Sequence, residues 1–188
     1  MTVCIAAITK ESLIVSASDR MVSTGAFSSD KLVSKSELFH DEWSALLAGN
    51  DISSSIPILR RADASLQSLP NTFENACECL ENAYKRQLEE RISDSILAPY
   101  GIDLKEFMDK GASRFTPDVF NLICEQVRNQ SLGCELFSHG FDTSGSPHIF
   151  TVASPGVLDV YATHPVPFRV KVPRGARLDA LNRCYAPL

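Results

Sequence analysis

Apolar and polar residues alternate near the start of the chain in a way that predicts short strands. Residues 2–8 and 13–18 are rich in Val, Ile and small side chains, and the polar residues 9–12 separate them. This pattern is typical of a β-hairpin. A polar turn also separates the apolar runs 36–38 and 43–47, which predicts a second strand pair. The first part of the chain is therefore predicted to form two hairpins, side by side.

Helical periodicity dominates the middle of the chain. Apolar residues recur at three- and four-residue steps over 73–97, and this spacing indicates a long amphipathic helix. A shorter helix is predicted to begin after Asp51 or Ser53, either of which can cap it, and to run to Leu69. A further helix is predicted over 119–129. The apolar stripe of the long helix could bind a partner, but packing against a sheet is the favoured interpretation.

Three more apolar runs, 134–138, 148–153 and 157–162, follow the helices and are separated by turn residues. They predict a meander of strands. Strands, then helices, then strands indicate an α+β layered fold. A mixed segment starts at Pro99-Tyr100-Gly101 and leads to Thr116-Pro117-Asp118, which caps the helix over 119–129. The length of 188 residues is that of one ordinary domain.

Composition and charge exclude several classes of protein. The net charge of −5 argues against a general nucleic-acid binder, which needs clustered Lys and Arg. The apolar stretch 3–8 is far shorter than the roughly 20 residues of a membrane-spanning helix, and the start lacks a secretory signal. We therefore expect a cytoplasmic protein. The six cysteines are too sparse for a disulfide framework and lack zinc-site spacing, so we expect reduced thiols and neither a metal nor another cofactor.

The end of the chain differs in charge from the rest. Residues 165–188 contain five basic residues and one acidic residue, a net charge of +4, and four of the ten prolines. Two domains are therefore distinguished, 1–163 as the folded unit and 164–188 as an atypical basic, Pro-rich tail. One interpretation is a frame-shifted or otherwise replaced terminus. The other is a native tail that serves in docking.

Candidate chemistry begins at Thr2. Removal of Met1 would leave a hydroxyl and a free α-amine on one residue, and a Thr hydroxyl needs such an adjacent base to act as a nucleophile. Lys35 near the amine would lower its pKa, and Asp19 would hold Lys35 charged. Gly49 could bring a backbone N–H to a developing oxyanion. Each feature alone is usually structural; their order and spacing indicate a site.

With these residues the sequence resembles the proteasome β-type subunits, which are N-terminal-nucleophile (Ntn) hydrolases. The matched features are the segment 14–20, the 16-residue step from Asp19 to Lys35, the 14-residue step from Lys35 to Gly49, and Gly140-Phe141-Asp142. The resemblance covers residues 2–163.

This resemblance implies a four-layer α-β-β-α sandwich, which we expect to be incomplete at its C-terminal end. It also implies an apolar specificity pocket lined by Val22, Val33 and Leu47, and assembly into a homo-oligomer. The function predicted in this way is threonine-type hydrolysis of a peptide or amide substrate.

Two alternatives remain open. The first is a non-catalytic, proteasome-like structural subunit that assembles into an oligomer without exposing a free Thr2. The second takes Cys4 as the nucleophile after removal of the three residues that precede it. A Cys buried in a strand is the favoured interpretation of that position, because free Cys is among the most buried residue types.

Overall fold

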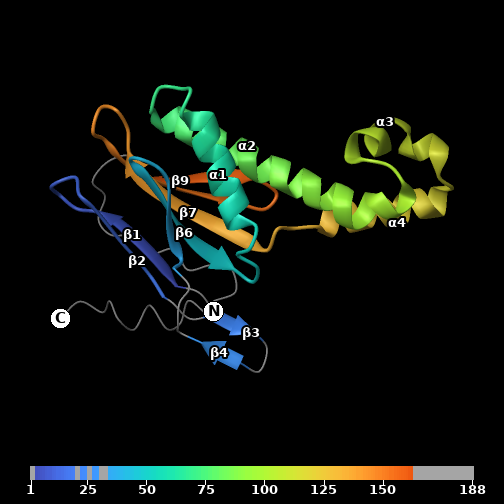
Figure 1. The fold of residues 1–188 in the computed structure, drawn as a ribbon, viewed down its shortest axis with the longest axis horizontal. Coiled ribbons are helices and arrows are strands. Elements are labelled where there is room, and N and C mark those ends of the chain that lie inside the picture. Colours follow the sequence, from blue (N-terminus) through green and yellow to red (C-terminus); the bar gives the residue numbers. More distant parts are fainter. Residues whose placement is uncertain (1–2, 20–21, 25–26, 30–33, 163–188) are drawn as a thin grey trace.

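The computed structural model describes residues 3–19, 22–24, 27–29 and 34–162, with the backbone alone described for 22–24 and 27–29 (Figure 1). The strands are β1 (Cys4–Ile8), β2 (Ile14–Ser18), β3 (Val22–Thr24), β4 (Phe27–Ser29), β5 (Ser36–His40), β6 (Trp43–Gly49), β7 (Cys134–Phe141), β8 (Pro147–Ala153) and β9 (Val157–Ala162). The helical elements are α1 (Ser55–Leu66), α2 (Phe73–Ile92), the π-helical turn η1 (Ser93–Leu97), the 3-10 turn η2 (Ala98–Tyr100), α3 (Leu104–Arg114) and α4 (Pro117–Asn129).

The strands form one large antiparallel sheet and two separate hairpins. The large sheet has the order β5-β6-β7-β8-β9. β1 pairs with β2 from Cys4 opposite Ser18 to Ile8 opposite Ile14, and β3 pairs with β4. The two strand pairs expected from the sequence both form, as β1–β2 and β5–β6. They belong to different sheets, because β5 and β6 are part of the large sheet. Side-by-side placement was therefore wrong: the β1–β2 hairpin packs against a face of the large sheet, because its apolar side chains need a second apolar surface.

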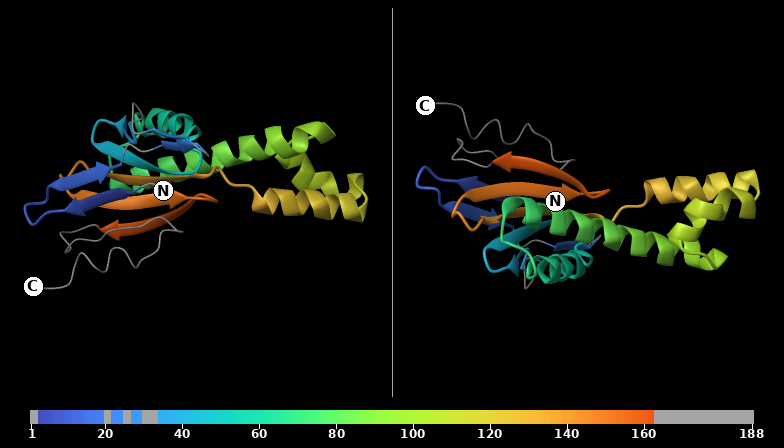
Figure 2. Two further views of the ribbon diagram at one scale, coloured as in Figure 1. Left: turned by 90° about the horizontal axis from the view of Figure 1, so that it is seen from below. Right: turned by 90° about the horizontal axis from the view of Figure 1, so that it is seen from above.

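Helices α1 and α2 cover one face of the large sheet (Figure 2). Alternation along β6 explains why this face is apolar: Trp43, Ala45 and Leu47 all belong to the core shared with the helices. Helix α2 begins where the Thr72 side chain accepts a hydrogen bond from the backbone N–H of Asn75. That cap is typical of a helix start.

The β1–β2 hairpin covers the opposite face. Cys4, Ala6 and Ile8 of β1 pack against Leu46 and Ala48, the β6 residues that alternate with the helix-facing set. Their outward neighbours Val3 and Val15 are exposed. The helices, the large sheet and the β1–β2 hairpin thus form successive layers, and the predicted α+β sandwich is confirmed.

An arm of helices projects beyond the sheets (Figures 1 and 2). The long helix predicted over 73–97 ends as an α-helix at Ile92 and continues through η1 and η2. The mixed segment that starts at Pro99 contains α3, capped by Asp103. Aromatic rings stabilise the arm, since Phe107 packs against Phe115 and Phe120. The tail predicted over 164–188 lies outside the described residues.

We predict that Phe150→Ala destabilises the fold strongly. The ring is fully buried and makes edge contacts with Trp43 and Phe73, each with ring centroids 5.8 Å apart. Loss of a buried ring leaves a cavity, so the free energy of unfolding should fall by about 3–5 kcal/mol in urea titrations. Val160→Ala is the control, because Val160 lies opposite Phe150 in β9 but is 49% exposed. Equal effects of the two substitutions would contradict this account of the core.

Candidate functional site

A buried ion pair lies where the hairpin meets the large sheet. The Lys35 ammonium Nζ is 2.8 Å from Oδ1 of Asp19, and the side chains are 3% and 26% exposed. Burial of an unpaired ammonium is costly, so this geometry requires a counter-ion. The two residues predicted from their spacing are therefore brought together.

Main-chain hydrogen bonds hold the pair at the ends of three strands. The backbone N–H of Asp19, just after β2, donates to the carbonyl of Val3 at 3.0 Å. The backbone N–H of Leu47 donates to the carbonyl of Lys35 at 2.7 Å, which ties the residue before β5 to β6. The start of β1, the end of β2 and the start of β5 consequently meet at this ion pair.

Cys4 lies beside the pair and is a poor candidate nucleophile. Its Sγ is 3.8 Å from the Leu47 carbonyl. Burial raises the pKa of the thiol to about 11; the charges of Asp19 and Glu135 add to this rise, and Lys35 opposes it. Nucleophilic attack needs a thiolate. The interpretation of Cys4 as nucleophile therefore finds no support, whereas the expected burial of this residue is confirmed.

Gly49 ends β6, two residues beyond Leu47, and so lies near the pair along the same strand. Its φ of +134° is a conformation that other residues rarely adopt. A Cβ at this position would collide with the carbonyl of Gly133. The fold alone thus requires glycine here, and the role of its N–H in catalysis remains a prediction.

The other predicted site residues are placed only in part. Thr2 and Val33 lie outside the described residues, and only the backbone of Val22 is described. Leu47 is 2% exposed and packs in the core beneath the helices. The specificity pocket attributed to these side chains therefore stays a prediction.

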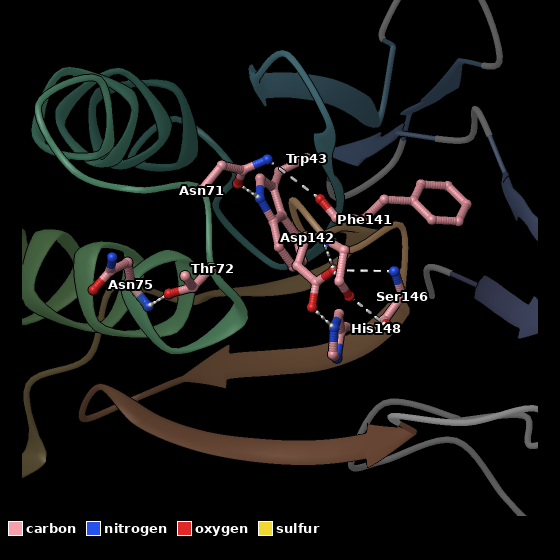
Figure 3. A network of polar contacts seen from close by, with 9 residues as sticks. Trp43, Asn71, Thr72, Asn75, Phe141, Asp142, Ser146 and His148 are labelled. Atoms are coloured by element: carbon pink, nitrogen blue, oxygen red, sulfur yellow. Dashed lines mark hydrogen bonds and ion pairs between the residues drawn. The ribbon is translucent and has the colours of Figure 1, made fainter.

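A second polar cluster, which the sequence analysis did not identify, follows β7 (Figure 3). Oδ1 of Asp142 accepts hydrogen bonds from the backbone N–H of Ser144 and Ser146 and from the Ser144 hydroxyl. Its Oδ2 is 3.0 Å from Nε2 of His148. The imidazole ring stacks on Phe73, with centroids 4.3 Å apart. The turn between β7 and β8 is thereby joined to the start of α2.

Asn71 completes this connection. Its side chain accepts a hydrogen bond from the Trp43 indole and donates one to the Phe141 carbonyl, while its own carbonyl accepts from the N–H of Thr143. Cys134 at the start of β7 is paired with Gly49, and Gly140 near its end is paired with Trp43. The Asp142 cluster thus lies at the opposite end of the sheet from Gly49. It joins the turn after β7 to the start of α2 and is not part of the ion-pair site.

Other features of the described residues lie apart from the ion pair. A cavity of about 670 Å³ lies between β5 and α1, lined among others by Glu37, Phe39, His40 and Asp63; neither Lys35 nor Asp19 lines it. Over the described ranges, no group of three His, Cys, Asp or Glu side chains is arranged to hold a metal ion. None of the helices in the described part combines the length and apolar character needed to span a bilayer.

No protein-family model and no curated protein matches the sequence. Among solved structures, the fold is similar to that of the Anbu (Gly-1) mutant from Hyphomicrobium sp. strain MC1, with a TM-score of 0.58 and 13% sequence identity. The match covers 97% of this chain and 65% of the Anbu chain, so the chain spans less than two thirds of that protein's length. At this identity the likeness concerns the fold alone.

These comparisons correct one expectation from the sequence. The motifs around Asp19, Lys35 and Gly49 suggested a proteasome β-type subunit, but no family model supports that assignment, and the similar structure is Anbu at 13% identity. The assignment was wrong because it rested on three short motifs at matching intervals. Such motifs comprise few residues and do not show that the rest of the sequence is similar to the family. What stands is a likeness in fold to Anbu.

We predict that the Asp142 cluster makes stability depend on pH in acid. Burial disfavours the carboxylate, but hydrogen bonds from Ser144, His148 and Ser146 outweigh it and lower the pKa of Asp142 to about 2. Because the pKa falls on folding, the stabilisation is complete above about pH 4 and is lost as the pH falls toward 2. Urea titrations across this window should show the loss in the parent and a shallower one in Asp142→Asn. The control Asp159→Asn, at an exposed position of β9, should match the parent; an unchanged profile for Asp142→Asn would contradict the prediction.

Proposed function

We propose that the protein is a threonine-type hydrolase of a peptide or amide, with Thr2 as nucleophile after removal of Met1. The observation that carries the proposal is the buried ion pair between Lys35 and Asp19. A lysine that is 3% exposed and paired at one strand end is costly to maintain for stability alone. The ion pair lies near the start of β1, because the backbone N–H of Asp19 donates to the Val3 carbonyl, and this supports a role toward the residue that precedes Val3.

The covalent structure supports this role. Thr2 lies outside the described residues, but it is bonded to Val3, and the Val3 carbonyl accepts the backbone N–H of Asp19. Successive Cα atoms are only about 3.8 Å apart. A mature chain that starts at Thr2 would therefore present its amine and hydroxyl close to the Lys35–Asp19 pair.

The proposed reaction needs only groups that this chain supplies, together with water. The neutral α-amine of Thr2 takes the proton of the hydroxyl, and Oγ bonds to the amide carbon. The N–H of Gly49 donates to the oxyanion. The C–N bond breaks as the leaving nitrogen takes the proton from the amine, and water then hydrolyses the ester and regenerates the hydroxyl. Lys35 favours the neutral amine by like-charge repulsion, and Asp19 holds Lys35 in place.

Substrate selection and assembly complete the proposal. Val22, Val33 and Leu47 are proposed to form an apolar specificity pocket, so peptides with an apolar side chain next to the scissile bond are the substrates to test first. Assembly into a homo-oligomer is proposed with it. The likeness in fold to Anbu supports a hydrolase with a proteasome-like fold in general terms.

Thr2→Ala is predicted to abolish turnover of fluorogenic peptides while leaving the fold intact, because only the nucleophilic hydroxyl is removed. Intact-mass measurement of the parent should show that Met1 is absent and the amine unmodified. Retained Met1 or an acetylated Thr2 would make the mechanism impossible and would favour a non-catalytic structural subunit. Equal turnover by parent and Thr2→Ala would exclude Thr2 as nucleophile.

Asp19→Asn is predicted to lower turnover by about 100-fold or more and to reduce the free energy of unfolding by about 1–3 kcal/mol, because the Lys35 ammonium loses its partner. The double variant Asp19→Asn/Lys35→Met is the matched control. Removal of both charges should restore much of the stability but none of the turnover. If the double variant hydrolysed peptides at the parental rate, the ion pair would be structural only.

A further inference from the structure

Strand β5 forms one edge of the large sheet and pairs only with β6. The Lys35 carbonyl accepts a hydrogen bond from the N–H of Leu47, which sets the alternation of hydrogen bonds along this strand pair. The next residue that bonds toward β6 is Glu37. The N–H and C=O groups of Ser36 and Leu38 therefore point away from β6, toward the outer side of the sheet.

One of these two outward-facing positions is already occupied. The Ser34 hydroxyl donates to the Ser36 carbonyl at 2.8 Å and accepts from the Ser36 N–H at 3.3 Å. Over the described ranges, no other strand bonds to the outward-facing main chain of Leu38, and the Leu38 side chain is 73% exposed. An exposed edge of this kind is a template for a further strand. The edge is consequently closed at Ser36 and open at Leu38.

The cavity of about 670 Å³ between β5 and α1 adjoins this open edge, because Glu37 and Leu38 both line it. Glu37 lies opposite Ala45, which belongs to the core beneath the helices, so its side chain projects to the side of α1. The buried side chains of Phe39 and Leu59 give the cavity an apolar wall. An apolar wall with a few polar groups is typical of a binding site.

Negative charge predominates around the cavity. Three carboxylates, those of Glu37, Asp41 and Asp63, line it together with a single guanidinium, that of Arg60. Asp63 is engaged, because its Oδ1 lies 3.0 Å from Nδ1 of His40. Glu37 and Asp41 have no ion-pair or hydrogen-bond partner in the part of the chain that the structure describes. A cation on an aliphatic stem, as in a Lys or Arg side chain, complements both the charge and the apolar wall.

We propose that the outer edge of β5 binds an extended peptide, which adds as an antiparallel strand at Leu38 and places a Lys or Arg side chain in the cavity beside α1. In such strand addition the main chain supplies affinity and alternate side chains supply specificity. The peptide residue opposite Leu38 exchanges two hydrogen bonds with it. The neighbours of that residue project to the other face, beside Glu37. The ligand is therefore a segment in which apolar and basic residues alternate.

A fluorophore-labelled peptide of alternating Val and Lys, with both termini blocked, tests the proposal by fluorescence anisotropy. Methylation of its Val amide nitrogens removes the N–H groups that face Leu38, so affinity should fall about tenfold. Methylation of its Lys amide nitrogens is the matched control and should leave affinity unchanged, because these groups point away from β5. Replacement of Lys by norleucine should weaken binding about threefold or more.

Glu37→Gln is the corresponding change in the protein. It removes a carboxylate beside the bound Lys side chain, so affinity should fall about threefold. Glu135→Gln is the control and should keep the parental affinity. Glu135 is also a half-exposed strand glutamate opposite an alanine, Ala48, but on the face that packs against the hairpin. Because both variants lose one negative charge, a general attraction between basic peptide and acidic protein would weaken binding equally in both.

Hydrogen exchange locates the bound peptide. The amide of Leu38 should exchange more slowly when the peptide is added, because its N–H then donates to the added strand. The amides of β9, which forms the other edge of the large sheet, should keep their rates. Protection of β9 in place of β5 would overturn the assignment of the site.

The remaining outcomes also decide the proposal. Equal binding of the two methylated peptides, or equal weakening in the two glutamate variants, would overturn it. A dimer of this chain that the peptide does not dissociate, without any change in anisotropy, would replace the peptide by a second copy as the occupant. The inference goes beyond the proposed function, because neither Lys35 nor Asp19 lines the cavity. Thr2→Ala should therefore bind the peptide with parental affinity, whether or not Thr2 proves to be the nucleophile.

Discussion

The ion pair between the buried Lys35 ammonium and the Asp19 carboxylate constrains the N-terminal part of the molecule. Lys35 precedes the edge strand of the large sheet, and Asp19 follows the hairpin that packs on that sheet. A charge held at 3% exposure tolerates little displacement of its counter-ion, because separating a buried ion pair is costly. The ion pair therefore sets the relation between the two layers at the end where β1 begins, and the apolar cluster around Cys4 sets it along the rest of their length.

The two ends of β7 carry opposite kinds of polar structure. At its C-terminal end Asp142 accepts hydrogen bonds from neighbouring groups, and Asn71 joins the helices to the same turn. Polar groups satisfied in this way rigidify a fold. At its N-terminal end Glu135 has no such partner in the described part of the chain. Polar groups that are satisfied internally support structure, whereas one that retains its full hydrogen-bonding capacity is available to a ligand or to another part of the site.

Local periodicity was sufficient for most elements and insufficient for their arrangement. Period-two and period-3.6 patterns predicted β1, β2, α1, α2 and the three last strands. An element that buries one face has apolar residues at the period of that element, and this spacing is visible in the sequence. The placement of the two hairpins in different sheets depends on tertiary packing, which no local pattern encodes. Helix α3 was missed because its buried residues, Phe107 and Gly111, are too few for a clear stripe. The Lys35–Asp19 contact was predictable from spacing, whereas the Asp142 cluster became recognisable only when the turn after β7 was seen to lie beside the start of α2.

Under the proposed mechanism the site acts on the amine twice, with opposite effects. Before attack, Lys35 favours the neutral amine that serves as base. As Oγ bonds to the carbonyl carbon, its proton passes to the amine, and Lys35 opposes the ammonium that forms. The Asp19 carboxylate carries the opposite charge and offsets this repulsion. Only an interaction that is stronger after the proton transfer than before it accelerates the reaction, so the ion pair must act as a unit rather than as a lone ammonium.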